Sequence, residues 1–226
     1  MNDIKVQNIV CIIASLILLG MTIISAVTSS GRLTYEIVTG LFCALFCLVP
    51  ILLRRLKLIT LPTAFIIMAE IAVFLHAYGV LLMRYDFVPM WDTVTHTISS
   101  AVVAMIVFYG VQYIEMHDSE MHATPKMIHV YIFLITMTFS VIWEVFEIFS
   151  DAAFGIHMQY SPFDTIRDFT CDAAGAAIVI LFSHFSLKKH DIAETVNAMH
   201  IHPMFERYVS RHSGKKIDDH SEDNKN

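Results

Sequence analysis

Six long apolar stretches are the feature that most restricts how this chain of 226 residues can fold. A helix needs roughly 20 residues to cross the hydrocarbon core of a bilayer, which is about 30 Å thick. The stretches that suit such helices cover residues 6–27, 35–53, 61–83, 92–114, 127–149 and 167–187. Hydrophobic residues make up 56% of the chain and charged residues only 16%, as is typical of membrane proteins with several spans. The sequence therefore predicts an all-α bundle of six transmembrane helices.

The chain is expected to form one membrane domain followed by a polar tail. No Gly/Ser-rich or Pro-rich segment separates the six stretches, so residues 1–187 are predicted to be one domain. Residues 188–226 are polar, and we expect a partly disordered cytoplasmic tail there. The first stretch follows Lys5 as a signal peptide would, but it exceeds the roughly 7 to 15 apolar residues of a signal peptide. We therefore expect it to be retained as a helix.

Lys and Arg residues near the ends of the stretches predict the orientation of the bundle. Six spans place both termini on the same side of the membrane. If that side is cytoplasmic, the inside segments carry seven basic residues, namely Lys5, Arg54, Arg55, Lys57, Lys126, Lys188 and Lys189. The outside segments then carry three, namely Arg32, Arg84 and Arg167. Because basic residues are enriched in cytoplasmic loops, we predict a multi-pass protein of the cell membrane with both termini in the cytoplasm.

Ionisable residues occur in or at the ends of these stretches, where each costs about 2.5 to 3.5 kcal/mol on insertion scales. They form three sets, namely Asp92 and His96; Glu144, Glu147 and Asp151; and Asp164, Asp168 and Asp172. Within each set, the spacing places the side chains on one face of a helix. In the predicted orientation all three sets lie near the outer surface, so the three faces can share one polar pocket.

So many carboxylates in one pocket repel one another unless some are protonated or a cation is bound. Mg²⁺, Mn²⁺ and Ca²⁺ prefer carboxylate oxygens, whereas Zn²⁺ would use His96 with two or three carboxylates. The candidate metal ligands are His96, Glu144, Glu147, Asp151, Asp164, Asp168 and Asp172. The candidate catalytic residues are His96, Glu144 and Asp168, with His96 as ligand or general base. The alternative is that Asp92, Asp164 and Asp168 are partly solvated acids at helix starts, where negative charge is favourable.

Two further polar residues, Glu70 and His76, lie in the third stretch. They could extend the outer site inward as a proton path, which is a common use of acids and histidines inside membranes. The alternative is a single protonated Glu70 that forms a hydrogen bond with a neighbouring Ser or Thr.

Small side chains predict where helices pack closely. The segment that contains Ala173, Gly175 and Ala177 has the small-xxx-small spacing that lets two helices approach. We expect it to bring the sixth helix against the fourth or fifth. The four cysteines also fall within the stretches, at positions 11, 43, 47 and 171, and form no disulfide or zinc-binding pattern. They are expected to pack as small apolar residues.

Three motifs occur in order in the second half of the chain. They are Trp91-Asp92-x-x-x-His96, then Trp143-Glu144-x-x-Glu147 with Asp151, and then Asp164-Thr165-x-x-Asp168-x-x-x-Asp172-x-x-Gly175. From about residue 84 to 187 this pattern resembles the YjdF-type uncharacterised membrane proteins and, more distantly, the VanZ-like proteins. VanZ-like proteins have a Gln near the position of Glu147 and an Asn near that of Asp172, so this chain is more acidic. The resemblance implies a polytopic membrane protein of unestablished activity, apart from the association of VanZ-like members with glycopeptide-antibiotic resistance.

The series Asp164, Asp168 and Asp172 is also similar to the aspartate-rich motifs with which membrane prenyltransferases and CDP-alcohol phosphotransferases hold Mg²⁺ and a diphosphate. The Asp-Gly and Ala-Arg elements of the CDP-alcohol motif are absent from the sequence, and few Lys or Arg lie near the acids. Diphosphate sites usually contain several such basic residues, so this assignment is disfavoured.

Three functions from different classes fit these features. The first is a divalent-metal-dependent enzyme, a hydrolase or transferase that acts on a lipid-linked or other membrane-proximal substrate at the outer leaflet. The alternatives are a cation- or proton-coupled transporter and a non-catalytic structural or resistance protein. The expected partners are the lipid bilayer and a lipid-like substrate. The net charge of −6 gives no indication of nucleic-acid binding.

Overall fold

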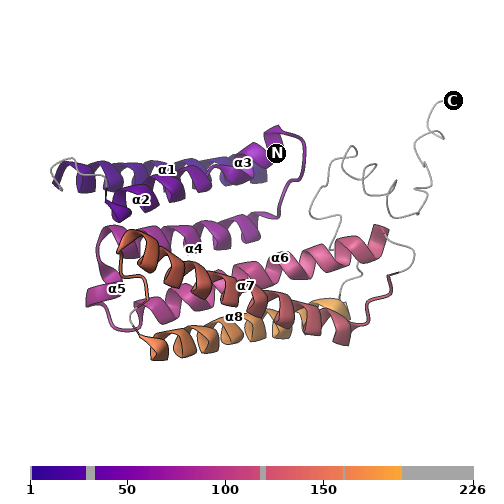
Figure 1. The fold of residues 1–226 in the computed structure, drawn as a ribbon. Coiled ribbons are helices and arrows are strands. Elements are labelled where there is room, and N and C mark those ends of the chain that lie inside the picture. The colour runs from indigo at the N-terminus through magenta and orange to yellow at the C-terminus, as the bar shows by residue number, and fades with distance from the viewer. Residues whose placement is uncertain (1, 29–33, 118–120, 160, 190–226) are drawn as a thin grey trace.

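The computed structural model describes residues 2–28, 34–117, 121–159 and 161–189, which form helices joined by short connections (Figure 1). The helices are α1 (Asn2–Thr28), α2 (Tyr35–Phe46), α3 (Val49–Arg55), α4 (Thr63–Leu81), α5 (Arg84–Phe87), α6 (Trp91–His117), α7 (Pro125–Phe154) and α8 (Pro162–Lys189). The predicted polar tail lies outside the described residues from position 190 onward.

Six membrane-spanning helices are confirmed by length and composition, with α2 and α3 together forming the second. The first three spans are more apolar than the last three. Large apolar side chains are exposed on the long helices; Leu16, Phe42 and Phe149 are each more than 60% exposed. Exposed apolar surface of this extent is unusual in soluble proteins and suits contact with lipid.

Two spans differ in detail from the prediction. The second is interrupted after Phe46, and Pro50 stands in the first turn of α3. Proline lacks a backbone N–H, and its ring clashes with the carbonyl of the residue four positions earlier, which is Phe46. The last span begins at Pro162 and not near position 167, so Asp164 lies in the first turn of α8.

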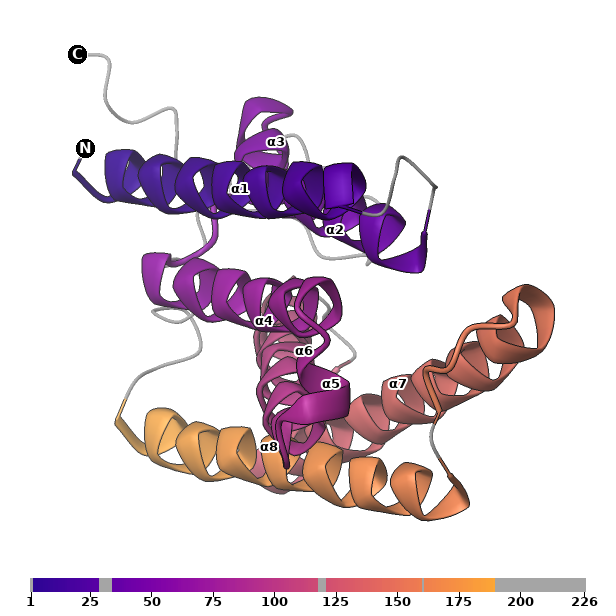
Figure 2. The same cartoon turned by 90° about the vertical axis from the view of Figure 1, so that its left-hand side faces the viewer.

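The spans form two groups of three helices. In one group α1, α2 and α4 pack together, and in the other α6, α7 and α8 pack together. The contact between α4 and α6 joins the two groups, and Figure 1 shows α4 between α1 and the α6–α8 layer. In Figure 2, α7 slants away from α4, which leaves the two helices apart along most of their length.

Each group has its own apolar core. In the first group, Leu18, Cys43, Ala44, Cys47 and Ala77 form a buried cluster. All four cysteines are free and buried, as their predicted packing role requires. In the second group the buried cluster includes Ala104, Val107, Phe108, Val111, Ile128, Ile132 and Val179. This cluster occupies the half of α6–α8 remote from Asp92, so the other half is left for polar side chains.

The predicted close contact of the last helix is confirmed, because α8 packs on both α6 and α7. A Cβ atom at Gly175 would lie 2.5 Å from the carbonyl oxygen of Thr97 and 3.0 Å from the backbone nitrogen of Ala101. The small residues in the contact are Gly175 and Ala176, whereas Ala177 is exposed. Ala173 and Ala177 therefore do not form the close contact. Their side chains point away from the buried face of α8, which contains Asp168, Asp172, Gly175 and Val179.

Candidate functional site

The three predicted polar faces converge where α6 begins, α7 ends and α8 begins. We call this region the Asp92 end; it lies to the left in Figure 1. Glu144, Asp168 and Asp172 are each at most 3% exposed there, and Glu147 and Asp164 are also buried. Asp92 and Asp164 do lie in first turns of helices, where the helix dipole favours negative charge. The buried acids nevertheless lack the solvent that the alternative of solvated helix ends requires.

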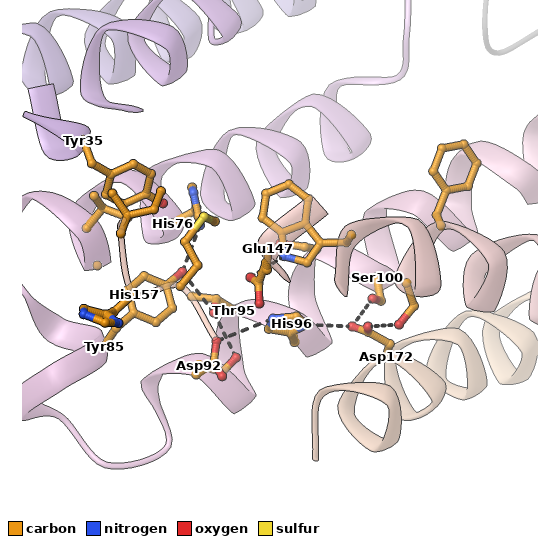
Figure 3. A pocket seen from close by; sticks show the side chains of 18 of the residues that line it. Tyr35, His76, Tyr85, Asp92, Thr95, His96, Ser100, Glu147, His157 and Asp172 are labelled. Atoms are coloured by element: carbon orange, nitrogen blue, oxygen red, sulfur yellow. Dashed lines mark hydrogen bonds and ion pairs between the residues drawn. The ribbon is translucent and has the colours of Figure 1, made fainter. Parts of the chain in front are cut away.

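Asp172 of α8 joins all three helices of this group. One of its carboxylate oxygens accepts hydrogen bonds from Ser100 Oγ at 2.5 Å and from His96 Nδ1 at 3.2 Å, both on α6 (Figure 3). The other oxygen accepts one from Ser140 Oγ on α7. Hydrogen bonds to a carboxylate are stronger than those between neutral groups. This arrangement fixes both the carboxylate and the orientation of the His96 ring.

His96 lies between two carboxylates. Its Nδ1 faces Asp172, and its Nε2 lies 3.5 Å from Asp92 Oδ1 (Figure 3). One ligand atom from each of Asp92, His96 and Asp168 can be chosen so that all three lie within 4.8 Å of one another. The Oδ1 atom of Asp168 is buried and has no hydrogen-bond partner among the described residues.

Arg167 is the basic side chain at this group of acids. Its Nη2 donates to Asp92 Oδ2 at 2.6 Å and to Asp164, and its Nε lies 3.7 Å from Asp168 Oδ1. The guanidinium side chain is 47% exposed, so it covers the site from the solvent-accessible side. Two basic residues, Arg167 and His96, and six acids, Asp92, Asp164, Asp168, Asp172, Glu144 and Glu147, lie at this end. Carboxyl groups therefore outnumber basic groups at the Asp92 end.

The two glutamates of α7 have different surroundings. Glu147 Oε1 accepts a hydrogen bond from Trp143 Nε1 at 2.8 Å. Neither oxygen of Glu144 has a hydrogen-bond partner among the described residues, although the Thr165 hydroxyl is close enough to interact electrostatically. Glu144 is thus a buried acid whose nearest compensation comes from the Thr165 hydroxyl and from His96, and burying an acid with so little hydrogen bonding is costly.

Asp151 lies outside the group formed by Asp92, His96 and Asp168. Its two oxygens accept hydrogen bonds from the backbone N–H groups of Met158 at 2.7 Å and Gln159 at 3.0 Å. Gly155, which has a positive φ of 64°, ends α7 just before this turn. Asp151 therefore shapes the connection between α7 and α8.

A cavity of about 530 Å³ adjoins the site. It is bounded by α2, α4, α5, α6, α7, α8 and the connection after α7. Its polar lining includes His76, Asp92, His96, Ser100, Glu147 and Asp172, and its aromatic lining includes Tyr35, Tyr85, Phe139 and Trp143. The acids on α6, α7 and α8 thus border a space large enough for part of a small molecule.

A hydrogen-bonded series runs along one wall of the cavity. His76 Nδ1 lies 2.9 Å from the Tyr85 hydroxyl, which donates to Thr95 Oγ1 at 3.3 Å (Figure 3). Thr95 in turn donates to the backbone oxygen of Asp92 at 2.9 Å. Burial raises the pKa of the Tyr85 hydroxyl, which keeps this group a hydrogen-bond donor at neutral pH.

The structure separates the two residues of the predicted proton path. His76 lines the cavity, and its ring centroid lies 6.0 Å from that of Trp143. Glu70 is buried in the α1–α2–α4 group near the thiols of Cys11 and Cys47, and one of its oxygens has no hydrogen-bond partner among the described residues. The path stays a prediction.

The comparison with protein families gives one match. Residues 10–189 match the family described as "Predicted membrane protein (DUF2238)". The chain belongs to this family. The predicted YjdF-type resemblance is thereby confirmed at the level of an uncharacterised membrane protein family, whereas the VanZ-like link stays a prediction. No curated protein and no solved structure matches the chain.

Sequence reasoning missed several residues of the site in this member of the family. Ser100, Ser140 and the ion pairs of Arg167 were not predicted, although a signal was present for the two serines. Ser100 follows His96 by one helical turn, and Ser140 precedes Glu144 by one turn. Each predicted polar face therefore continues one turn further into its helix.

Proposed function

We propose that this integral membrane protein is a divalent-metal-dependent enzyme that acts on a lipid-like substrate. The observation that carries the proposal is the grouping of Asp92, His96 and Asp168, whose ligand atoms can lie within 4.8 Å of one another. An imidazole nitrogen and carboxylate oxygens are both ligands of Zn²⁺, and three protein ligands leave a position open for water at a catalytic site. Mn²⁺, Mg²⁺ and Ca²⁺ also take carboxylate ligands.

The surroundings of His96 support its role as a ligand. Metal-binding histidines usually donate their second ring N–H to a carboxylate or carbonyl, which fixes the ring and its tautomer. Asp172 is placed to accept from Nδ1, which leaves Nε2 on the side of Asp92. In this proposal, Asp172 is a positioning residue held by Ser100 and Ser140.

The charge balance also supports a bound cation. The partnerless Oδ1 of Asp168 is a buried acceptor, and leaving such an atom unpaired costs about 1–3 kcal/mol or more when it is charged. Arg167 offsets part of the negative charge, but it approaches Asp168 Oδ1 only to 3.7 Å. A divalent ion would satisfy this oxygen and reduce the repulsion between Asp92 and Asp168.

The adjoining cavity indicates where a substrate would bind. A metal ion at Asp92, His96 and Asp168 would polarise a substrate bond or a water molecule. Glu147 lines the cavity and is placed to accept a proton there. The reaction would be a hydrolysis or group transfer. With both termini cytoplasmic, as the Lys and Arg distribution predicts, the site would lie near the outer leaflet of the cell membrane.

Elemental analysis of detergent-purified protein tests the proposal. The wild-type protein should contain a divalent metal ion, and Asp168→Asn and His96→Gln should lose it. Asp151→Asn is the matched control, because the Asp151 carboxylate binds the backbone of the connection after α7 and its substitution should leave metal content unchanged. Folded wild-type protein that holds no metal would count against the proposal if Mg²⁺, Mn²⁺, Ca²⁺ and Zn²⁺ also failed to raise its unfolding temperature. Bound metal at 100 times its Kd should stabilise the fold by about 2.7 kcal/mol.

A further inference from the structure

We propose that the cavity beside this site selects an amphiphile whose headgroup carries a positively charged nitrogen, such as an amine or a quaternary ammonium group. The inference rests on the proposed function in assigning this molecule the role of substrate. The binding itself follows from the lining of the cavity.

The first argument concerns charge. Five acids line the cavity, namely Glu36, Asp86, Asp92, Glu147 and Asp172, against three histidines, His76, His96 and His157, and none of the described Lys or Arg residues lines it. Sites for phosphate, sulfate or carboxylate headgroups usually contain Arg or Lys to neutralise the anion. The lining therefore disfavours an anionic headgroup and favours a cationic one.

The second argument concerns Glu147, which is only 8% exposed. Trp143 donates a hydrogen bond to one carboxylate oxygen, and the described residues provide no hydrogen bond to the other. Figure 3 shows Glu147 between His76 and His96, with its carboxylate at the cavity. Glu147 does not belong to the group formed by Asp92, His96 and Asp168. A metal ion held by that group therefore leaves the charge of Glu147 available for a separate cation.

The third argument concerns the size and the weak hydration of that cation. Tyr35, Tyr85 and Trp143 line the same cavity as Glu147. Aromatic faces attract cations, and groups of aromatic side chains are a common means of binding quaternary ammonium groups. A small, strongly hydrated metal ion would gain little from such walls. An organic cation would use both the aromatic faces and the carboxylate of Glu147.

The fourth argument concerns the apolar part of the ligand. The cavity is bounded by α4 on one side and α7 on the other, and these helices lie apart along most of their length (Figure 2). Met83 and Phe139 line the cavity and are 51% and 54% exposed, respectively. An alkyl chain can extend past them into the bilayer while the headgroup stays beside Glu147.

Tryptophan fluorescence gives a direct test, because Trp143 lies in the cavity wall. In a Trp91→Phe background, Trp143 is the sole tryptophan. The probe is dodecyltrimethylammonium, added below its micellar concentration to protein in maltoside detergent, with decanoate as the anionic comparison. The ammonium compound should give a saturable spectral change, and decanoate should give none. Glu147→Gln should weaken ammonium binding by about tenfold or more, since it removes a buried counter-charge.

Glu70→Gln is the matched control, since Glu70 is a buried membrane acid that does not line the cavity. It should bind ammonium like its parent. Equal binding of ammonium and decanoate, or unchanged binding in folded Glu147→Gln protein, would overturn the inference. The titration is repeated after treatment with a metal chelator. If the protein binds ammonium but holds no metal even before chelation, the inference stands and the proposed metal-dependent enzyme fails. If the protein holds metal but does not bind ammonium, the proposed enzyme stands and the inference fails.

Discussion

The α1–α2–α4 group and the α6–α7–α8 group both pack three membrane helices closely, but they bury different side chains. The first group is filled by Leu18, Ala44, Ala77 and cysteines, with Glu70 as its single buried acid. In the second group, apolar residues fill one half of the seam and carboxylates occupy the other half. The first group shows that such packing does not require a cluster of acids. The acids at the Asp92 end are therefore not a general requirement of close helix packing, which supports the proposed ligand.

The largest effect is expected from Gly175→Ala, which tests the close approach of α8 to α6. The added Cβ would meet the backbone at Thr97 and Ala101, which cannot move as freely as a side chain. We expect the free energy of unfolding to fall by roughly 2–3 kcal/mol, measured by denaturation in detergent. Gly20→Ala and Gly110→Ala are controls because no atom lies within 4 Å of an added Cβ. If Gly175→Ala lowered the free energy of unfolding no more than these controls, the close approach of α8 to α6 would be contradicted.

The next effect should come from Ser140→Ala, which removes one of the donors to Asp172. Hydrogen bonds to charged groups contribute about 1.5–3 kcal/mol, and we expect a loss near 2 kcal/mol in the same measurement. Ser15→Ala in α1 is the matched control, since Ser15 is buried but makes no hydrogen bond to a charged group among the described residues. If both serine substitutions lowered the free energy of unfolding equally, the second helix group would not depend on its hydrogen bonds to a carboxylate.

A smaller effect is expected from Arg167→Gln. The substitution removes the ion pairs of Arg167 with Asp92 and Asp164, but the arginine is about half exposed, so water screens the interaction. We expect the free energy of unfolding to fall by about 1 kcal/mol, and the loss should diminish when a divalent metal is added. Arg84→Gln is the control, because Arg84 contacts only the ring of Tyr78, at 5.5 Å, among the interactions described for it. Its loss should be smaller and independent of metal.

The smallest effect is expected from Glu70→Gln in the first group. The amide has the same shape and can accept a hydrogen bond from a thiol, so the unfolding free energy should change by less than about 1 kcal/mol. Metal content and ammonium binding should not change. A loss of metal in this variant would mean that Glu70 and the Asp92 end are coupled, which would support the predicted proton path.

The six spans were predictable because long apolar stretches leave few alternatives in a bilayer. The break before α3 also had a signal in Pro50, whose cost to a continuous helix is local. The close contact made by small residues was predicted in the correct helix and correctly at Gly175, but Ala173 and Ala177 were the wrong positions. Ala173 and Ala177 have the right spacing, yet the acids and Gly175 decide which face of α8 turns inward.

The convergence of the three polar faces was predictable from helical spacing and the even alternation of spans. The hydrogen-bond partners within the site were not predictable. The hydrogen bond between Ser140 and Asp172 depends on how α7 and α8 are positioned along each other, which no local pattern determines. Asp151 shares the face of Glu147, but the turn after Gly155 provides it with backbone partners. Tertiary structure therefore gives Asp151 backbone partners, places Asp92 beside His96 and Asp168, and pairs Arg167 with the acids.

The decrease in apolarity from the first three spans to the last three has a consequence for biosynthesis. Segments leave the ribosome in chain order, and strongly apolar segments enter the bilayer unaided, whereas acidic residues near a helix centre oppose entry. The α1–α2–α4 group can thus be inserted before the acidic helices are complete. The last helices then enter beside an assembled neighbour, with Ser100 of α6 and Ser140 of α7 placed to donate to Asp172 of α8 and Asp92 of α6 placed to pair with Arg167 of α8.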